Sequence, residues 1–205
     1  MSHAVYLDCQ SVRKSYGRKV VLEDCGFAVE SGEVVALVGA NGSGKTTLLR
    51  CLLGFSRPDT GQVRLNQHLG YCPQDNYLDR RLTVSEHFDL AAAILQRTWD
   101  VSAAWCTSLI ERFQLGAHLL TLIGNLSAGT YQKVKFVTSV LHRPELLLCD
   151  EPCDGFDWAM YEMYWSLIGE LRASGAAVLM ITHIAYERDR FGRILTLREG
   201  RVHEG

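Results

Sequence analysis

The chain has 205 residues, of which 47% are hydrophobic and 21% are charged, and its formal net charge is −2. This length supports one well-formed core, and the composition is that of a folded globular protein rather than a disordered or fibrous chain. The charge balance gives no sign of the broad basic face that nucleic acid requires, so we expect no nucleic-acid partner. The seven cysteines include no Cys-x-x-Cys pair, which favours reduced thiols in a cytosolic setting.

The apolar runs are short. Val34–Val38, Leu146–Cys149 and Ala176–Ile181 have the length of strands, and none approaches the length that spans a bilayer. The N-terminus lacks a basic stretch followed by an apolar one, so we expect no signal peptide. If the protein works at a membrane, we expect another chain to supply the spanning segment.

The first 38 residues alternate short β-rich runs with turns. Turn signals occur at Tyr16-Gly17 and Ser31-Gly32. The runs that this pattern predicts as strands are Val5–Leu7, Val20–Leu22, Phe27–Val29 and Val34–Val38.

A glycine-rich motif follows the last of these runs and precedes an expected helix over Leu48–Leu53. Its sequence is Gly39-Ala40-Asn41-Gly42-Ser43-Gly44-Lys45-Thr46-Thr47, which matches the phosphate-binding P-loop pattern. Glycines let the backbone curl so that its N–H groups point at phosphate oxygens, and the helix that follows adds the positive end of its dipole. We expect Lys45 to reach the β- and γ-phosphates and the Thr46 hydroxyl to coordinate Mg²⁺. The alternative is a glycine-rich turn without a ligand.

The middle of the chain changes from strand to helix. Pro58–Gly61 is predicted as a turn, with strands over Gln62–Leu65 and Leu69–Cys72. From Leu82 to about Asn125 the residue pattern is typical of helices. Thr83-Val84-Ser85-Glu86 fits a capping box that opens one helix. The apolar residues expected to face the core from this helix and the next are Phe88, Ala91, Ala92, Leu95, Trp105, Leu109, Ile110 and Phe113.

A strongly apolar strand, expected at Leu146–Asp150, ends in two carboxylates, Asp150 and Glu151. Ligand sites in open α/β sheets lie at the carboxyl ends of strands. Asp150 is therefore placed to hold Mg²⁺ beside Thr46, and Glu151 to polarise an attacking water. The alternative is a pair of solvated carboxylates in a loop at the strand end.

The last third alternates helix and strand. Leu146–Asp150 and Val178–Thr182 are nearly continuous apolar runs with helical segments on both sides. Such strands predict a parallel sheet covered on both faces, so the fold class is α/β. We find no internal repeat and no linker, so we expect one unit with a helical insertion near its middle.

Together these motifs resemble the nucleotide-binding domain of an ABC transporter, in order and over essentially the whole chain. Further positions carry the same resemblance. Tyr16 resembles the aromatic that stacks on adenine, Gln74 the glutamine that touches Mg²⁺, and His183 the switch histidine near the γ-phosphate. Leu126-Ser127-Ala128-Gly129-Thr130 stands where the family has its Leu-Ser-Gly-Gly-Gln signature, and Gly155-Phe156-Asp157 where it has its D-loop. Taken alone, the tyrosine, the glutamine and the histidine are each also compatible with an ordinary structural role.

The resemblance implies an architecture and a set of site residues. The fold is a P-loop NTPase core of ABC type with an N-terminal antiparallel β subdomain, and a single domain covers residues 1–205 with a helical subdomain at about 75–142. The implied ligands are ATP and Mg²⁺. The implied catalytic residues are Glu151, His183, Lys45 and Gln74. The implied ligands of the metal are Thr46, Gln74 and Asp150. The residues implied to bind the nucleotide are Tyr16, Gly39, Asn41, Gly42, Ser43, Gly44, Lys45, Thr46, Thr47, Ser127 and Gly129.

The resemblance also implies partners. Ser127 is a good N-cap for a helix running to Leu141, and in the family that helix end contacts the γ-phosphate of ATP on another subunit. One P-loop and one signature therefore call for a second ABC domain, identical or related. A transmembrane permease would dock on the segment from about Asp75 to Asn125, which places the chain at the cytoplasmic face of the membrane. Small subunits of this kind often serve exporters, which favours export over import.

Departures from the family pattern keep other readings open. Ala128 replaces a glycine of the signature, Thr130 replaces its glutamine, and Phe156 stands where the D-loop usually has Leu. A heteromeric complex with one weaker site, or a largely non-catalytic ATP-binding subunit, would fit these changes. A soluble ABC ATPase is the other alternative, although the chain has neither a coiled-coil insertion nor two ABC units. A P-loop kinase would leave Ser127–Gly129 without a purpose.

Overall fold

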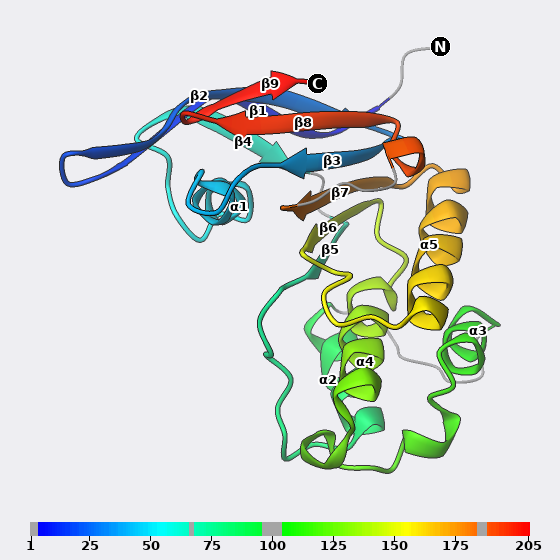
Figure 1. Cartoon of the computed structure of the whole chain (residues 1–205). Helices are drawn as coiled ribbons and strands as arrows, with labels where there is room; N and C mark the ends of the chain where they lie inside the picture. The colour runs from blue at the N-terminus through cyan, green and yellow to red at the C-terminus, as the bar shows by residue number, and fades with distance from the viewer. Residues whose placement is uncertain (1–3, 66–67, 96–103, 184–187) are drawn as a thin grey trace.

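The computed structural model describes residues 4–65, 68–95, 104–183 and 188–205. Strands of one sheet form the upper part of the molecule in Figure 1, and most helices lie below them. The strands are β1 (Val5–Tyr16), β2 (Lys19–Glu30), β3 (Val34–Val38), β4 (Thr60–Leu65), β5 (Leu69–Cys72), β6 (Leu146–Asp150), β7 (Ala177–Thr182), β8 (Arg193–Arg198) and β9 (Arg201–Glu204). The α-helices are α1 (Lys45–Leu52), α2 (Val84–Ile94), α3 (Ala104–Arg112), α4 (Ala128–Val140) and α5 (Trp158–Ala173).

The sheet order is β4-β1-β2-β9-β8-β3-β7-β6-β5. Strands β8, β3, β7, β6 and β5 run parallel, and the apolar residues of the central strands β3, β7 and β6 are buried almost throughout. In β6, Leu147 and Cys149 enter the core cluster that includes residues of α4 and α5, whereas Leu146 and Leu148 enter the cluster that includes residues of α1. This alternation confirms the α/β fold with a parallel sheet covered on both faces.

The other half of the sheet differs in detail from the prediction: β4, β1 and β2 pair antiparallel, whereas β9 pairs antiparallel with β8 and parallel with β2. The separate runs Val20–Leu22 and Phe27–Val29 form one strand, β2, which pairs with an equally long β1. Irregularities in the β1–β2 register let β2 continue through two consecutive exposed acids, Glu23 and Asp24. Two exposed residues in a row break the period-2 pattern, so the sequence predicted two short strands where the structure has one. The turn predicted at Pro58–Gly61 is also shorter than predicted, because β4 already begins at Thr60.

The helices begin where their capping residues predict. Thr83 caps α2 in a complete capping box, and the Ser127 side chain accepts a hydrogen bond from the Thr130 N–H at the start of α4. Helix α1 begins at Lys45, three residues earlier than expected, because the P-loop turns directly into the helix. Of the apolar residues expected on the two middle helices, Leu95 and Phe113 fall one residue beyond α2 and α3.

The helices are divided between two parts of the molecule. Figure 1 shows α1 under the sheet, while α2, α3 and α4 gather at the lower end of the molecule beyond β5 and β6. Helix α5 runs from this lower part toward the sheet. Among the described residues, no helix combines the length and the apolar character needed to cross a membrane.

Candidate functional site

The loop between β3 and α1 is shaped by its glycines. Gly42 and Gly44 have φ values of 79° and 107°, a region that L side chains rarely adopt. A Cβ at Gly39 would lie 2.7 Å from the Ser43 Oγ and 2.8 Å from the Leu197 carbonyl oxygen, so a side chain does not fit there. No side chain caps α1, which leaves the N–H groups of its first turn available to an anion.

Lys45 is turned back onto this loop. Its side chain is buried, and Nζ donates to the carbonyl oxygens of Gly39 at 2.6 Å and Ala40 at 3.3 Å. The Ser43 hydroxyl is also buried and makes no hydrogen bond within the described protein. A buried ammonium hydrogen-bonded to two carbonyl oxygens, next to an unsatisfied hydroxyl, favours an anionic ligand in the loop.

Asp150 and Glu151 lie at the carboxyl end of β6. Burial and the charge of Glu151 raise the pKa of Asp150 to about 6, against the opposite effect of Lys45. Glu151 has a left-handed backbone, with φ 48°, and its N–H donates to the Ile181 carbonyl on β7 at 2.8 Å. The structure therefore places both carboxylates at the sheet edge where the sequence predicted them.

His183 directly follows β7, the strand next to β6. Its Nδ1 lies 2.5 Å from the Glu151 Oε2, which is hydrogen-bond distance. The Glu151 side chain is 11% exposed and that of His183 is 41% exposed, so the pair opens to solvent on the histidine side. The structure thus brings Glu151 and His183 into contact, whereas the sequence predicted only that each follows a parallel strand.

The donor set at this edge suits a hard cation. Thr46 is exposed at the start of α1. Asp150 ends β6 and Gln74 follows β5, the neighbouring parallel strand, since Cys72 pairs with Cys149. Hydroxyl, carboxylate and amide oxygens are ligands that Mg²⁺ accepts. Within the described residues, no three His, Cys, Asp or Glu side chains gather to hold a metal. A cation here would therefore complete its shell with water and phosphate oxygens rather than with protein groups alone.

Tyr16 ends β1 at the hairpin turn and is 50% exposed. The Nζ of Lys14 lies 5.6 Å from the centre of its ring. The same hairpin approaches the P-loop, because a Cβ on Gly44 would lie 3.2 Å from side-chain atoms of Val21 and Leu22. The ring is thus an accessible aromatic surface on an element that packs against the loop.

Gln74 follows β5, at the same end of the parallel strands as Asp150, whereas the signature residues lie at the start of α4. Gln74 is exposed in the loop after β5, and its carbonyl accepts a hydrogen bond from the Lys135 Nζ at 3.0 Å. Ser127 and Gly129 lie at the start of α4, which Figure 1 shows at the lower end of the molecule, apart from α1. The structure therefore does not bring the signature to the chain's own P-loop. Lys135, a buried lysine within an apolar helical run, was not singled out by the sequence analysis.

Comparison with known proteins identifies the family. Residues 22–154 match the family model described as ABC transporter. An uncharacterized ABC transporter ATP-binding protein of Methanocaldococcus jannaschii is 32% identical over 96% of this chain and 76% of its own length. The Nod factor export ATP-binding protein I of Burkholderia pseudomallei is 32% identical over 97% of this chain and 70% of its own length.

Solved structures agree. An ATP-binding subunit of an ABC transporter superposes with a TM-score of 0.88 at 31% identity, over 98% of this chain and 89% of that one. An ATP-binding cassette in its ADP conformation shares the fold with a TM-score of 0.80 at 22% identity, over 98% of this chain and 91% of that one. The sequence-based identification is confirmed: this chain belongs to the ABC transporter family, as a nucleotide-binding domain with ATPase activity.

Proposed function

We propose that this chain hydrolyses ATP to power export through a membrane-spanning partner, and that it works at the cytoplasmic face of the membrane. The observation that carries the proposal is the meeting of Lys45, Asp150, Glu151 and His183 around one sheet edge. The direction of transport is supported by the relatives of known role, whose name describes export of Nod factor. The cargo is a property of the partner and does not enter the proposal.

The nucleotide would lie along the P-loop. Lys45 would leave the carbonyls of Gly39 and Ala40 for the β- and γ-phosphates, which exchanges dipoles for full negative charges. Backbone N–H groups of the loop and of the first turn of α1 would hold the remaining phosphate oxygens. Adenine would stack on Tyr16. The loop residues proposed to line this site are Gly39, Asn41, Gly42, Ser43, Gly44, Thr46 and Thr47.

Thr46, Asp150 and Gln74 would hold Mg²⁺, which supplies charge neutralisation at the phosphates. Asp150 must be ionised for this role, and the charge of Lys45 favours that form against the opposing effects of burial and of Glu151. Glu151 would orient and polarise the attacking water, and His183 would hold Glu151 in place. Most of the rate then comes from positioning and from electrostatic stabilisation.

A second ABC domain would complete the site. Ser127 caps α4, and Gly129 has open space around its Cα, because a Cβ added there would have nothing within 4 Å of it. This uncrowded helix end is suited to the γ-phosphate of a nucleotide on another domain. We infer a head-to-tail pair of two such chains, or of this chain and a relative.

The partner would dock on the segment from about residue 75 to residue 125. A cavity of about 320 Å³ opens there, and its lining includes Asn76, Leu78, Arg80 and Ile123. Leu120 and Leu122 are exposed nearby in sequence, Leu120 at 87%. A cavity and exposed leucines on one segment are features of surfaces that accept a helix from another protein.

The test is to tag this chain in its native cell, solubilise the membranes and identify the proteins that co-purify. A polytopic membrane protein in stoichiometric amount is the expected result. Recovery from the soluble fraction alone, with ribosomes or without a partner, would contradict the proposal and favour a soluble ABC ATPase. Substitution of Leu120 by Asp should reduce recovery of the membrane protein, whereas the same change at the exposed Phe55, outside this segment, should not.

A further inference from the structure

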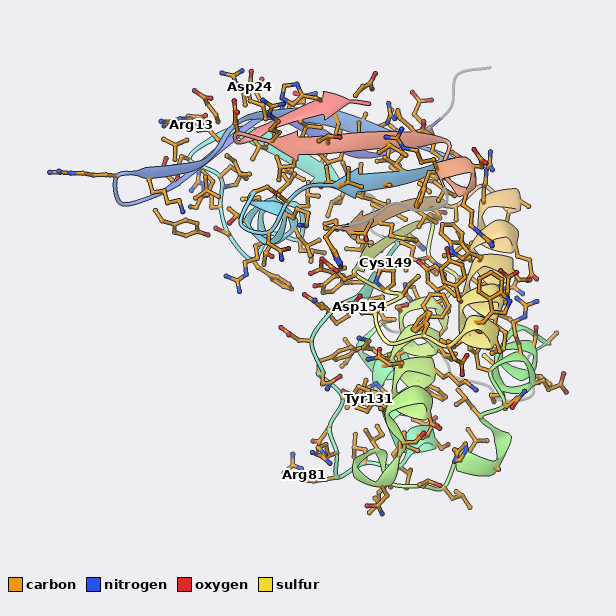
Figure 2. All side chains as sticks on the ribbon, viewed as in Figure 1. Arg13, Asp24, Arg81, Tyr131, Cys149 and Asp154 are labelled. Carbon is orange, nitrogen blue, oxygen red and sulfur yellow. The ribbon has the colours of Figure 1, made fainter. Side chains whose placement is uncertain are left out.

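Helix α4 holds the loop that follows β5 at two points. The Tyr131 hydroxyl accepts a hydrogen bond from the Leu78 N–H at 3.0 Å. The Lys135 Nζ donates to the Gln74 carbonyl oxygen at 3.0 Å. Residues four apart lie on one face of a helix, so Tyr131 and Lys135 contact loop positions that are also four apart. Figure 2 marks Tyr131 on α4, below the Cys149 end of β6.

Lys135 is a costly residue for this position. Its side chain is only 3% exposed, and Val134 and Phe136 beside it in sequence are fully buried. Removing an ammonium from water costs several kcal/mol, and a carbonyl dipole returns only part of that. An apolar side chain of similar length would fill the space at a lower cost, so packing alone does not account for a lysine here.

The contact falls at a point that matters for the reaction. Gln74 lies two residues after β5, and Asp150 is the last residue of the neighbouring strand β6. The charge of Lys135 also acts on Asp150 and favours its ionised form, although burial and the charge of Glu151 outweigh this effect and raise the pKa of Asp150. The buried side chain of Lys135 thus links α4 to the backbone of Gln74 and acts on the carboxylate of Asp150.

We propose that Lys135 is a positioning residue, which anchors the Gln74 backbone to α4 so that the Gln74 side chain is held at the cation site. This inference depends on the role proposed above for Gln74. Because Ser127 and Lys135 lie on the same rigid helix, about 12 Å apart along its axis, a displacement of the signature end would reach Gln74 through this bond. A partner nucleotide at Ser127 would thereby be sensed at the metal-binding edge.

The decisive experiment is a double-mutant cycle on the full chain with Lys135→Met and Gln74→Ala. Lys135→Met fills the same volume without the charge or the donor, so we expect the fold to persist. Residues that orient a metal ligand typically contribute 10- to 100-fold. We expect Lys135→Met to lower kcat by about tenfold and to raise the Mg²⁺ concentration needed for half-maximal turnover. In the Gln74→Ala background it should have no further effect.

A binding measurement complements the cycle. The rise in melting temperature that Mg²⁺ adds to ATP alone should shrink in Lys135→Met, while the rise from ATP in EDTA should stay. Lys135→Arg keeps a charged donor and should recover part of the loss. Lys133→Met makes the same chemical change on the same helix, at a half-buried position, and should leave all of these quantities unchanged.

The possible results distinguish a failure of the role proposed for Gln74 from a failure of the role proposed for Lys135. If Gln74→Ala itself leaves turnover unchanged, the proposed role of Gln74 fails and the inference about Lys135 fails with it. If Gln74→Ala is slow but the two substitutions are additive, or Lys135→Met is as fast as the parent chain, only the inference about Lys135 is overturned. A Lys135→Met chain that does not fold would mean a structural role and would overturn it as well. None of these results depends on a transport partner.

Discussion

His183 and Glu151 are joined across two neighbouring strands: Nδ1 of the histidine lies 2.5 Å from Oε2 of the glutamate. Their strands, β7 and β6, are parallel neighbours, so both residues leave the sheet at the same edge. The Glu151 backbone is held in a left-handed conformation by its bond to the Ile181 carbonyl. A non-glycine residue in this region stores strain, which the surrounding sheet must maintain. The carboxylate is therefore pre-oriented by both its backbone and its neighbour.

Replacing Glu151 by Gln should remove hydrolysis and keep binding. The amide keeps the shape of the carboxylate but cannot accept a proton, and loss of a general base costs about 100-fold or more. Phosphate release would measure the loss, and titration with a fluorescent ATP analogue would show whether affinity is retained. Turnover equal to that of the parent chain would rule out the role proposed for Glu151.

Replacing His183 by Ala should act through Glu151. We expect turnover to fall by at least about tenfold, because the carboxylate loses the group that orients it. In a chain that already carries Glu151→Gln, the histidine substitution should add little, since residues that act as a unit are non-additive. Independent, multiplying effects in steady-state kinetics would contradict a shared role.

Asp150 should weaken the nucleotide-free fold at neutral pH. Burial and the charge of Glu151 raise its pKa from 3.8 to about 6, so ionisation is costlier in the folded state than in the unfolded state. This cost is full above pH 6, declines as the pH falls from 6 toward 4, and is absent below pH 4.

Asp150→Asn removes that cost. After allowance for solvent screening, we expect it to raise the free energy of unfolding by about 1–2 kcal/mol at pH 7.5. At pH 4 the gain should have nearly disappeared. Urea unfolding in EDTA measures both values, and Asp154→Asn provides the control, because this exposed carboxylate follows in the same loop (Figure 2). If Asp150→Asn raises the free energy of unfolding equally at both pH values, ionisation of Asp150 is not the cause of the gain.

Two helix caps separate stability from catalysis. Ser127 caps α4, and Thr83 caps α2. Replacing either by Ala should lower the free energy of unfolding by about 1 kcal/mol. Only Ser127→Ala should also lower ATPase activity, because only its helix end is proposed to face a partner's nucleotide. Equal activity of the two variants at matched temperature below the melting transition would argue against that contact.

Gly129→Ala should make the chain more stable and less active. The glycine lies in the first turn of α4 at negative φ with open space around it, so alanine is favoured there by up to about 1 kcal/mol. The added methyl group would instead stand between the helix end and a bound phosphate. We expect a higher melting temperature together with reduced ATPase activity at concentrations where two chains associate. Undiminished activity at those concentrations would mean that the helix end does not approach the nucleotide.

The sequence by itself determined the features that depend on short stretches of chain. The P-loop needs its glycines, lysine and threonine within nine consecutive residues, and α2 and α4 begin at local capping residues, so these could be read directly. The strands β3, β6 and β7 were equally clear, because burial on both faces makes each a continuous apolar run. The family and its α/β fold followed from these local signals in their order.

Tertiary structure decided the contacts between distant residues. Glu151 contacts His183, 32 residues away in the sequence, and Lys135 contacts Gln74, 61 residues away. No local sequence pattern predicts either contact. The length of β2 was also concealed, since register shifts against β1 allow two consecutive exposed acids within one strand. Local chemistry selects which residues stand at a strand end or a helix start. Only the packing of β5, β6, β7 and α4 against one another determines which of them touch, because that depends on register and burial summed over the whole core.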